Sequence, residues 1–486
     1  MTSEFAGQRV VVAGVAVSGV AAAEALLDRD ASVVVVDGRA GEREQDAAAR
    51  LRARGAEVRL GDAETPVDAD LVVTSPGWRP DQPLLVAALA AGSEVIGEPE
   101  LAWRLRPSGD RRPAPWVAVT GTNGKTTTVG MVEAILRAAG LRTVAAGNVG
   151  LPLVTAVLAE PAYDVLAVEL SSFQLHWSRD LAPEAAVVLN IAPDHLDWHG
   201  SLDAYAADKA AVWRYGGCGA YNADDALVTT LASQHLDDPH PFTLGEATWG
   251  GFGVVDGFLV DRMSGVSPDS EPDPPPVRDG GIPLVRVDEL HVPGPHNVAN
   301  ALAAAAVCKV FGLRGDPGIP WPAVGEGLRA YRPGPHRNEV VAERDGLQWV
   351  DDSKATNPHA AAASLSAYPS VVWIAGGLFK GADVDQLVAD EGSRLRAVIA
   401  IGTDRRPLLA ALARHAPDVP VVEVTDRDTE SMGGVMVAAV AAAAKLAAPG
   451  DTVLLAPAAA SMDQFRDYAD RGDQFAAAAR AAAGAS

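Results

Sequence analysis

Short runs of β-branched and other apolar residues recur along the chain, and each is followed by a longer stretch rich in Ala and Leu. Continuous apolar runs of this length are typical of strands buried on both faces, and the Ala/Leu-rich stretches are typical of helices. Strand and helix alternate, which predicts an α/β fold with parallel sheets covered by helices. The expected strands include Arg9–Ala13, Ser32–Val36, Leu71–Thr74, Trp116–Thr120, Val165–Glu169, Ala186–Asn190, Val371–Ala375, Ala397–Ile401 and Thr452–Ala456.

Two segments rich in Pro and Gly divide this pattern into three regions. One lies at residues 106–113 and also carries several charges, and the other lies at residues 331–335. Such composition is typical of linkers. The sequence therefore predicts domains at residues 1–110, 111–332 and 333–486. A further segment at 264–281 is rich in Pro, Asp, Ser and Gly, and it is predicted to be a mobile loop because it can bury little apolar surface.

Charge and cysteine content narrow the classes of partner and compartment. The 486 residues include 40 Lys and Arg against 63 Asp and Glu, a formal net charge of −23. That sign disfavours nucleic-acid binding, and it requires any site for anionic substrates to gather its own cations. Cys218 and Cys308 show no paired spacing, which fits a reducing cytoplasm. The N-terminus shows no signal-peptide pattern and no apolar run reaches 18 residues, so no membrane insertion is expected.

The first strand runs into a glycine-containing turn that resembles a degraded dinucleotide fingerprint. Gly14 and Gly19 are in place, but Ala16 stands where a second Gly would let the backbone approach a pyrophosphate. The second strand ends in Asp37, at the spacing of a ribose-binding acid. A dinucleotide site and a Rossmann-like layer that binds another ligand or none are both open. Ala16 disfavours NAD, whereas a diphosphate at the helix N-terminus stays compatible.

The strongest chemical signal is the segment Val117-Ala-Val-Thr-Gly-Thr-Asn-Gly-Lys-Thr-Thr-Thr128. A strand enters a Gly-rich loop and a helix follows, an order that lets backbone N–H groups point at phosphate oxygens. Lys125 can balance phosphate charge, and Thr126 can offer its hydroxyl to Mg²⁺. The loop departs from the general P-loop because Val119 stands at its first Gly position. The predicted ATP loop comprises Gly121, Thr122, Asn123, Gly124, Lys125, Thr126 and Thr127.

Three further residues are candidate ligands of a metal near this loop. Glu169 ends an expected strand, and a carboxylate at that edge suits a Mg²⁺ held together with substrate phosphates. His195 lies in the segment Asp-His-Leu-Asp, and Lys209 follows Asp208 on an expected helix. Taken alone, His195 fits a structural histidine better, and Lys209 fits a solvated helix face.

Together, the motifs GTNGKT (121–126), ELSSFQL (169–175) and DHLD (194–197) with Lys209 resemble the Mur ligases. These are ATP-dependent amide-forming enzymes of peptidoglycan precursor synthesis, and the resemblance covers essentially the whole chain. It implies an N-terminal Rossmann-like UDP-binding domain, a central P-loop-type ATPase domain with a mostly parallel sheet, and a C-terminal Rossmann-like domain. It also implies two Mg²⁺ ions, with Lys209 carbamylated to an anion. The implied metal ligands are Thr126, Glu169, His195 and Lys209.

The third region resembles the D-glutamate-adding branch of the family. The segments DDSKATNP (351–358), GGLFK (376–380) and APAAASMDQF (456–465) carry this likeness. By the resemblance, D-glutamate contacts Thr356, Lys380, Ser461, Met462 and Tyr468. The UDP part contacts Val17, Ser18, Asp37, Gly38, Arg39 and Gly77, which replaces the NAD interpretation. ATP contacts Arg337, Asp352, Lys354 and Asn297, the last beside the adenine. The sequence departs from the family pattern at Ala16, Asn338, Ala459 and Tyr468.

The implied reaction adds D-glutamate to UDP-N-acetylmuramoyl-L-alanine through an acyl phosphate made with ATP. The implied catalytic residues are Lys125, Asn148, His195 and Lys209, with Asn148 near the substrate and acyl phosphate. The expected protein is a cytoplasmic monomer that binds these small molecules. A folylpolyglutamate synthase-like ligase shares the loop but lacks a layer like residues 1–108. A P-loop NTPase acting as a regulator or motor predicts a strict GxxxxGK loop, and a dehydrogenase is supported only by Gly14 and Gly19.

Overall fold

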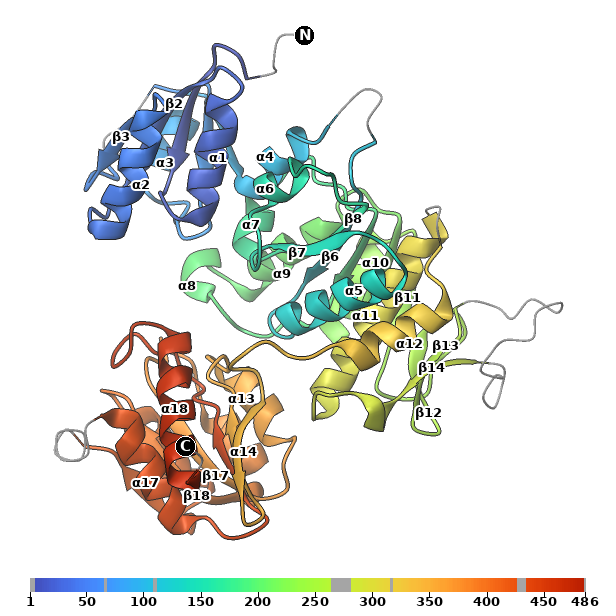
Figure 1. The fold of residues 1–486 in the computed structure, drawn as a ribbon, viewed down its shortest axis with the longest axis vertical. Coiled ribbons are helices and arrows are strands. Elements are labelled where there is room, and N and C mark those ends of the chain that lie inside the picture. Colours follow the sequence, from blue (N-terminus) through green and yellow to red (C-terminus); the bar gives the residue numbers. More distant parts are fainter. Residues whose placement is uncertain are drawn as a thin grey trace. The chain divides into compact units, whose positions relative to one another are not determined.

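The computed structural model of the chain describes residues 5–64, 68–107, 112–263, 281–314, 318–425 and 434–484 (Figure 1). These residues form three sheets, of five, nine and six strands. Strands and helices alternate along the chain, so the predicted α/β class is confirmed. Every expected strand is present, with ends within two residues of the prediction. Residues 264–280 of the expected mobile loop lie outside the described residues. Contacts divide the chain into two compact units, residues 1–289 with 300–331 and residues 290–299 with 332–486. The three predicted domain boundaries stay predictions.

The first sheet has the strand order of a doubly wound nucleotide-binding layer. Its order is β3-β2-β1-β4-β5 and every pair is parallel, so the direction of winding reverses between β1 and β4. In such sheets ligands bind beyond the carboxyl ends of the strands at this reversal. The elements are β1 (Arg9–Ala13), α1 (Val17–Leu27), β2 (Ser32–Asp37), α2 (Glu42–Ala53), β3 (Glu57–Leu60), β4 (Leu71–Thr74), α3 (Pro83–Ala90) and β5 (Glu94–Gly97).

The nine-stranded sheet forms the centre of the first unit. Its order is β14-β13-β12-β11-β10-β9-β6-β8-β7, parallel from β7 to β12 and antiparallel in β12–β14. Its strands are β6 (Trp116–Thr120), β7 (Thr143–Gly147), β8 (Val165–Glu169), β9 (Ala185–Val188), β10 (Cys218–Asn222), β11 (Asp238–Phe242), β12 (Phe252–Val255), β13 (Phe258–Asp261) and β14 (Ile282–Arg286). The helices around it are α5 (Lys125–Ala138), α6 (Leu153–Val157), α7 (Ser172–His176), α8 (Leu196–His199), α9 (Leu202–Ala210), α10 (Ala226–His235), α11 (Pro295–Arg314) and α12 (Trp321–Ala330).

Small residues allow two of these helices to pack closely. α5 and α12 lie side by side (Figure 1), and a Cβ placed on Gly327 would lie only 2.4 Å from the Cα of Ile135. A residue larger than Gly at position 327 would therefore push the helices apart.

Two buried carboxylates on α4 (Glu98–Arg104) tie the first sheet to the second. Glu98 accepts the backbone N–H of Val154 at the start of α6, at 2.8 Å. Glu100 accepts the N–H groups of Arg179 and Asp180 at 2.9 and 3.1 Å. One continuous cluster of buried apolar side chains also runs from β1 to β6 and beyond. Both features fix the junction within the first unit.

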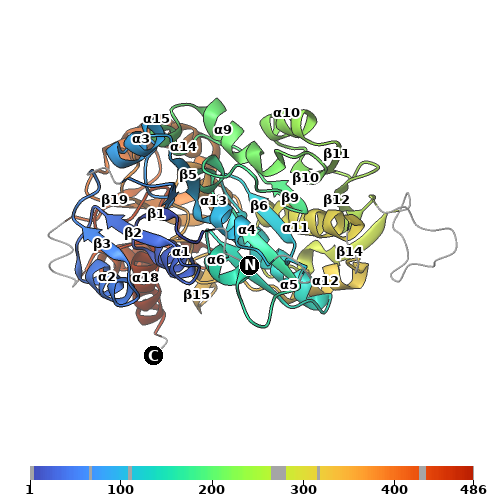
Figure 2. The same ribbon diagram turned by 90° about the horizontal axis from the view of Figure 1, so that it is seen from above.

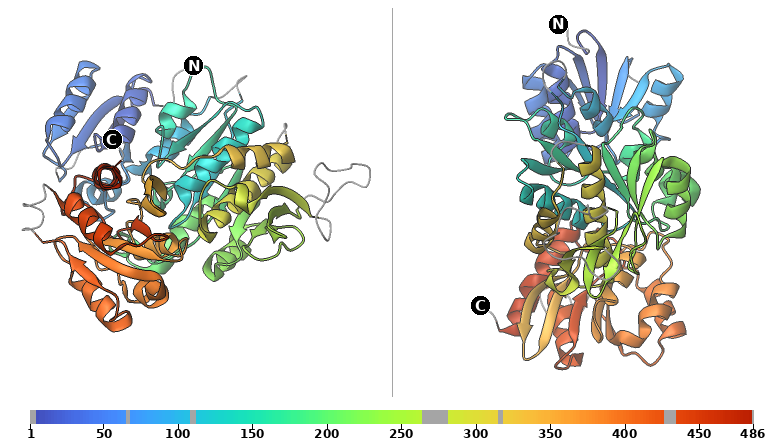
Figure 3. Two further views of the ribbon diagram at one scale, coloured as in Figure 1. Left: turned by 60° about the horizontal axis from the view of Figure 1, so that its bottom comes forward. Right: turned by 90° about the vertical axis from the view of Figure 1, so that its right-hand side faces the viewer.

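The second unit is built on the six-stranded sheet, with order β15-β16-β20-β17-β18-β19. A β15–β16 hairpin is antiparallel and the remaining pairs are parallel. Helices α13, α14 and α15 cover one face, and α17 and α18 cover the other (Figure 3). The elements are β15 (Glu339–Arg344), β16 (Leu347–Asp351), α13 (Pro358–Leu365), β17 (Val371–Gly376), α14 (Asp385–Glu391), β18 (Leu395–Ile401), α15 (Arg406–His415), β19 (Val421–Glu423), α17 (Val435–Leu446), β20 (Thr452–Leu455) and α18 (Tyr468–Ala483).

One described helix is long and apolar enough to cross a membrane by length and composition. This is α11 over Pro295–Leu313, and 67% of its apolar window is buried inside the protein. The core helix of a globular protein has the same features, and Ala301 to Cys308 are all fully buried. The sequence prediction of no membrane span rested on unbroken apolar runs, which the polar residues Asn297 and Asn300 interrupt.

Candidate active site

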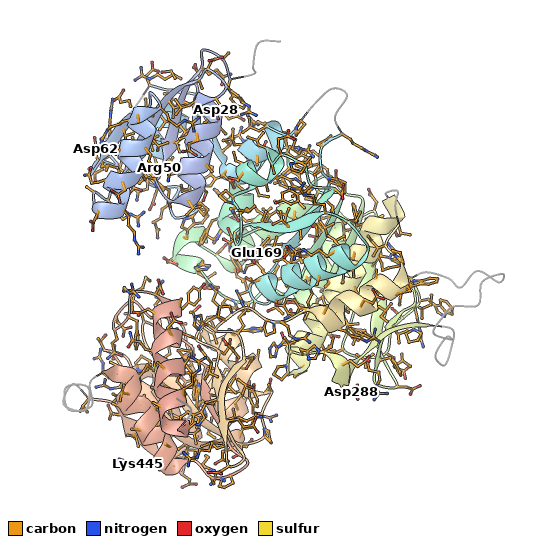
Figure 4. All side chains as sticks on the ribbon, viewed as in Figure 1. Asp28, Arg50, Asp62, Glu169, Asp288 and Lys445 are labelled. Atoms are coloured by element: carbon orange, nitrogen blue, oxygen red, sulfur yellow. The ribbon has the colours of Figure 1, made fainter. Side chains whose placement is uncertain are left out.

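The predicted phosphate loop and metal ligands follow four neighbouring parallel strands. The loop leaves β6, Asn148 leaves β7, Glu169 ends β8, and the segment that carries His195 leaves β9. These strands adjoin one another in the order β9-β6-β8-β7, so their carboxyl ends form one continuous edge of the sheet. Figure 4 labels Glu169 among the side chains of this region. The structure therefore brings together residues that lie far apart in the sequence.

The phosphate loop turns sharply into the N-terminus of α5. Gly124 has φ = 83°, and a Cβ there would lie 2.3 Å from Oδ1 of the buried Asn300. Only Gly fits this position, because the conformation is left-handed and the space is filled. The ammonium of Lys125 donates to the carbonyl oxygens of Gly121 and Thr122, at 2.9 Å each. Thr126 is half-buried and Thr127 is buried in the first turn of α5.

Asn190 holds this loop in place by hydrogen bonds, and the sequence analysis did not single it out. Its Oδ1 accepts the backbone N–H of Asn123 at 2.8 Å, and its Nδ2 donates to the Asn123 carbonyl at 3.1 Å. The backbone carbonyl of Asn190 also accepts the N–H of Thr122, at 2.9 Å. Its place two residues after β9 and its amide side chain were the only signals, since the partner lies 67 residues away.

Glu169 offers a buried carboxylate oxygen that suits a cation. Its Oε1 accepts a hydrogen bond from Nδ2 of Asn148 at 2.8 Å, whereas its Oε2 is buried without a hydrogen-bond partner. Burying a carboxylate oxygen without a partner is costly, so a positive charge is expected beside it. Carboxylate and hydroxyl oxygens are the ligands that Mg²⁺ prefers. The residues at this edge therefore fit the implied magnesium.

Lys209 is not on a solvated helix face, because its side chain is almost fully buried. Its amine on α9 donates to the carbonyl of Gly121 at 2.8 Å, the same oxygen that Lys125 contacts. Burial holds the pKa of Lys209 well below its usual value, and the nearby charge of Lys125 acts in the same direction. Glu169 acts in the opposite direction. A buried amine beside another cation is therefore an unfavourable place for a permanent ammonium.

His195 is not a buried structural histidine, since 47% of its side chain is exposed. It occupies a left-handed conformation (φ = 52°) just before α8 and packs against the ring of Phe173, with centroids 4.8 Å apart. Partial burial lowers the pKa of His195, and the cations Lys125 and Lys209 act in the same direction while Asp194 opposes them. This favours the neutral imidazole that can bind a metal.

Behind these residues the side chains of α7, α8 and α9 form a closed network. Nδ1 of His199 donates to Oδ2 of Asp208 at 2.8 Å, and its Nε2 contacts Oγ of Ser172 at 3.0 Å. Phe173 stacks on the ring of His199, with an interplanar angle of 7°. The hydroxyl of Tyr205 contacts that of Thr122 at 3.0 Å. The sequence analysis missed this network, which fixes α9 and thus Lys209 against the phosphate loop.

The predicted UDP-binding residues gather at the winding reversal of the first sheet. Asp37 is buried, and its two carboxylate oxygens accept the N–H groups of Val15 and Arg39, at 3.0 and 2.9 Å. Although burial opposes the shift, these hydrogen bonds lower the pKa of Asp37 and keep it ionised. Asp37 thus joins the turns after β1 and β2. Of the remaining predicted residues, Val17 and Ser18 begin helix α1, Gly38 and Arg39 lie on the turn after β2, and Gly77 lies on the turn after β4. All five are exposed or half-buried.

The two fingerprint glycines serve backbone packing at this turn. A Cβ on Gly19 would lie 2.0 Å from the carbonyl oxygen of Gly14, and a Cβ on Gly14 would lie 2.5 Å from Oγ of Ser75. Ala16, in contrast, is exposed at the start of α1. The free first-turn N–H groups of α1 remain suited to a diphosphate.

The predicted D-glutamate residues lie on three loops of the second unit, except Tyr468, which begins helix α18. These loops follow the adjacent strands β16, β20 and β17. Leu378 and Ala460 exchange two backbone hydrogen bonds, of 2.8 and 3.0 Å, which joins the loop of Lys380 to the loop of Ser461. The ammonium of Lys354 lies 3.6 Å from the ring centroid of Tyr468. Thr356, Met462 and Tyr468 complete this predicted set, and Met462 is 59% exposed.

A fully buried arginine on α18 joins two of these loops by hydrogen bonds, and the sequence analysis overlooked it. Arg471 donates to Oγ and the carbonyl of Ser353, at 2.9 and 2.8 Å, and to the carbonyl of Ala459 at 3.1 Å. Burial lowers the pKa of Arg471 to about 10. The neighbouring His336, also overlooked, bonds Oδ2 of Asp351 at 2.7 Å.

The predicted ATP-binding residues are divided between the two units. The phosphate loop belongs to the first, and Asn297, Arg337, Asp352 and Lys354 belong to the second. Asp352 is buried and accepts a hydrogen bond from Ser364; burial raises its pKa to about 6, against the opposing effect of that bond and of the charge of Arg337. The amide of Asn297 donates to the carbonyl of Pro293 at 2.7 Å.

Family profiles of known proteins match each of the three regions of the chain that carry a sheet. The profile of the MurD-like N-terminal domain of Mur ligases matches residues 8–97, the Mur ligase middle domain matches 119–246, and the Mur ligase glutamate ligase domain matches 336–459. The UDP-N-acetylmuramoylalanine–D-glutamate ligase of Thermobifida fusca is 53% identical over 99% of this chain and 100% of its own length. That of Streptomyces coelicolor is 51% identical over 99% of both chains.

Solved structures show the same fold at low identity. MurC of Thermotoga maritima, a UDP-N-acetylmuramate–alanine ligase, is 18% identical, with a TM-score of 0.56 over 98% of this chain and 99% of that one. MurF of Acinetobacter baumannii is 20% identical, with a TM-score of 0.54 over 87% and 86%. FolC of E. coli reaches a TM-score of 0.52 at 19% identity, over 74% of this chain and 89% of that one. With relatives above 50% identity over nearly its full length, the chain belongs to the Mur ligase family.

Proposed function

We propose that this chain catalyses the ATP-dependent addition of D-glutamate to UDP-N-acetylmuramoyl-L-alanine, in the cytoplasm and as a monomer. The relatives at 53% and 51% identity carry the name of this activity. The observation that carries the proposal is the convergence of Lys125, Lys209 and Glu169 at one sheet edge, beside a loop built for phosphates. Such a group of charges suits phosphoryl transfer to a carboxylate.

The reaction begins with a carboxylate, which is a poor electrophile at neutral pH. An oxygen of the L-alanine carboxylate attacks the γ-phosphorus of ATP, and ADP leaves, so that an acyl phosphate forms. The amine of D-glutamate then attacks the acyl carbon, the tetrahedral intermediate collapses, and phosphate leaves with loss of one proton from the amine. Lys125 and the backbone N–H groups of the loop balance the charge on the transferred group. Asn148, whose amide donates to Glu169, would lie beside that position.

Two magnesium ions are proposed as cofactors, held by Thr126, Glu169, His195 and Lys209. They would supply charge neutralisation for the phosphoryl oxygens. The burial of Lys209 beside Lys125 supports its conversion to a carbamate. In that step the neutral amine attacks CO₂, a nitrogen–carbon bond forms, and one proton is released. The resulting anion replaces a cation that would repel both Lys125 and a metal.

The two remaining sheets are proposed to bind the other substrates. The turns joined by Asp37 would bind the UDP part, with the diphosphate at the N-terminus of α1. Lys380, with Thr356 and Ser461, would bind the carboxylates of D-glutamate, and the neighbouring cation Lys354 would bind the ATP phosphates. In a protein of net charge −23 these local cations are what an anionic substrate requires.

Phosphate release from ATP tests the proposal directly. Turnover is measured with UDP-N-acetylmuramoyl-L-alanine or a folate acceptor, each combined with D-glutamate or L-glutamate. We expect sustained turnover only when the UDP substrate and D-glutamate are both present, because phosphorylation and amide formation are coupled. Equal turnover with L-glutamate, or with the folate acceptor, would overturn the assignment.

A further inference from the structure

Three metal-ligating side chains meet at the edge of the nine-stranded sheet opposite the phosphate loop. Cys218 is the first residue of β10, and Asp238 is the first residue of its neighbour β11. The two residues are direct partners in this parallel pair. His240 lies two residues after Asp238, on the same face of β11, since side chains alternate along a strand. β10 and β11 run side by side beneath α10 (Figure 2).

Two of the three pairs of ligand atoms already lie at the spacing of a metal site. Cys218 Sγ is 3.3 Å from Asp238 Oδ2, and the thiol donates a hydrogen bond to it. His240 Nε2 is 3.3 Å from the same Oδ2, and all three atoms lie within 4.8 Å of one another. Zinc bonds to these atom types are roughly 2.0–2.3 Å long, so ligand atoms around a tetrahedral ion are about 3.3–3.8 Å apart.

The imidazole of His240 is oriented as in a metal ligand. The residue is 7% exposed, and its Nδ1 contacts the backbone carbonyl of Gly250 at 3.1 Å. A carbonyl only accepts, so Nδ1 carries the proton, and in the neutral ring Nε2 then presents its lone pair. Metal-bound histidines are held in this way by a carbonyl or carboxylate on the far nitrogen.

The buried Nε2 of His240 lacks a hydrogen-bond partner and is aimed at the cluster. It is shielded from solvent, and its 3.3 Å approach to Asp238 does not have hydrogen-bond geometry. A lone pair facing a carboxylate oxygen is repulsive unless a positive charge lies between the two atoms. That charge is either a proton on His240 or a metal ion.

We propose that Cys218, Asp238 and His240 form a binding site for a thiophilic divalent cation such as Zn²⁺, separate from the magnesium site. Thiolate, imidazole and carboxylate are all zinc ligands, whereas thiolate is a poor ligand for Mg²⁺. Binding displaces the thiol proton of Cys218 and leaves the fourth position to water, because Asp238 is exposed and Cys218 is half-buried. The ion would tie the starts of β10 and β11 together.

Cobalt and zinc binding to the full-length, untagged protein test this site. Excess Mg²⁺ is present to occupy the carboxylate site at Glu169. We expect one Zn²⁺ per chain, a rise in melting temperature on binding, and a thiolate-to-cobalt charge-transfer band with Co²⁺. The chain has two cysteines, Cys218 and Cys308, so loss of the band in a variant of one of them identifies the cysteine that binds cobalt. Cys218→Ser is expected to abolish the band, and both Cys218→Ser and His240→Gln are expected to weaken zinc binding at least about tenfold.

The second cysteine provides the matched control. Cys308 is fully buried in α11, and Cys308→Ala is expected to keep the band and the zinc affinity. Absence of stoichiometric zinc in the wild-type protein would overturn the proposal and identify His240 as an imidazolium paired with Asp238. An unchanged zinc affinity in folded Cys218→Ser, or loss of the band in Cys308→Ala alone, would overturn it as well.

Discussion

At the scale of single residues, Asn190 decides the shape of the phosphate loop. Its side chain makes two hydrogen bonds with the backbone of Asn123, and its backbone holds Thr122. We expect Asn190→Ala to lower kcat/KM for ATP by roughly 10- to 100-fold, because the loop N–H groups lose their preorganised direction. Steady-state phosphate release at varied ATP measures the effect.

A variant of a neighbouring asparagine is the control that distinguishes this role from a general loss of stability. Asn222 ends β10 and donates to the carbonyl of Leu189 at 2.9 Å, one residue before Asn190. Asn222→Ala removes a comparable hydrogen bond without touching the loop, so kcat/KM for ATP is expected to fall much less. Similar losses in the two variants would show that Asn190 acts only through stability.

Among the predicted site residues, Lys209 has the environment that differs most from the one its sequence position suggests. It is buried against Gly121, and the charge of Lys125 opposes a second ammonium there. We expect Lys209→Ala to lose at least about 100-fold in activity and to regain part of it with added formate or acetate, which replace a carbamate. Activity is followed against acid concentration at fixed ionic strength.

The control for this rescue is a lysine on an exposed helix surface. Lys445 on α17 is exposed, and Lys445→Ala should keep full activity and show no response to acids. Rescue of Lys209→Ala by alkylamines alone would instead show that Lys209 acts as a cation.

At the scale of elements, helix α4 carries a carboxyl group whose titration affects folding. Glu98 is buried, and burial raises its pKa to about 7, although the N–H groups of Val154 and Leu153 act against the shift. The unfolded chain releases this proton near pH 4.3, so the folded chain holds the extra proton between about pH 4.5 and 7. Stability therefore falls as pH rises through this window, by about 3 kcal/mol in total.

Glu98→Gln is expected to remove that decline. The amide can still accept the N–H of Val154 but does not ionise, so the variant should equal the wild type near pH 4 and exceed it near pH 8. Urea midpoints across this range measure the difference. Glu343→Gln, at an exposed position on β15, should leave the wild-type profile unchanged. A wild-type midpoint that does not fall more steeply than that of Glu98→Gln would contradict the prediction.

Element boundaries were predicted well where burial alone decides them. The apolar runs of β1, β4, β6 and β8 match the predicted strands to the residue. β9 was predicted to reach Asn190 but ends at Val188, because Asn190 leaves the ladder to bond the phosphate loop. The order of strands within each sheet depends on long-range packing, and local pattern does not encode it. For the same reason, Asn300 and Arg471 were missed: their partners lie far away in the sequence.

At the scale of the whole molecule, each predicted set of ligand residues follows the carboxyl ends of one sheet. The UDP set follows β1, β2 and β4, the phosphate and metal set follows β6 to β9, and the D-glutamate set follows β16, β17 and β20. Motif spacing could predict the members of each set, since each motif directly follows a strand. Motif spacing could not predict that Asn297 and the phosphate loop lie in different units, because the boundary between the two units falls within helix α11.

This arrangement predicts that binding of the UDP substrate is separable from phosphoryl transfer. Lys125 contacts the carbonyls of its own loop after β6, whereas the proposed UDP residues lie on the turns of the five-stranded sheet. Lys125→Ala is therefore expected to reduce phosphate release at least about 100-fold, because a charge that balances the transferred group is lost. Its affinity for UDP-N-acetylmuramoyl-L-alanine, measured by calorimetry without ATP, should stay within about twofold of the wild type. Arg39→Ala, on the turn after β2, is the reciprocal variant, and it should weaken the UDP substrate while leaving ATP affinity unchanged. A folded Lys125→Ala protein that loses both activities together would show that the two sheets do not bind their ligands independently.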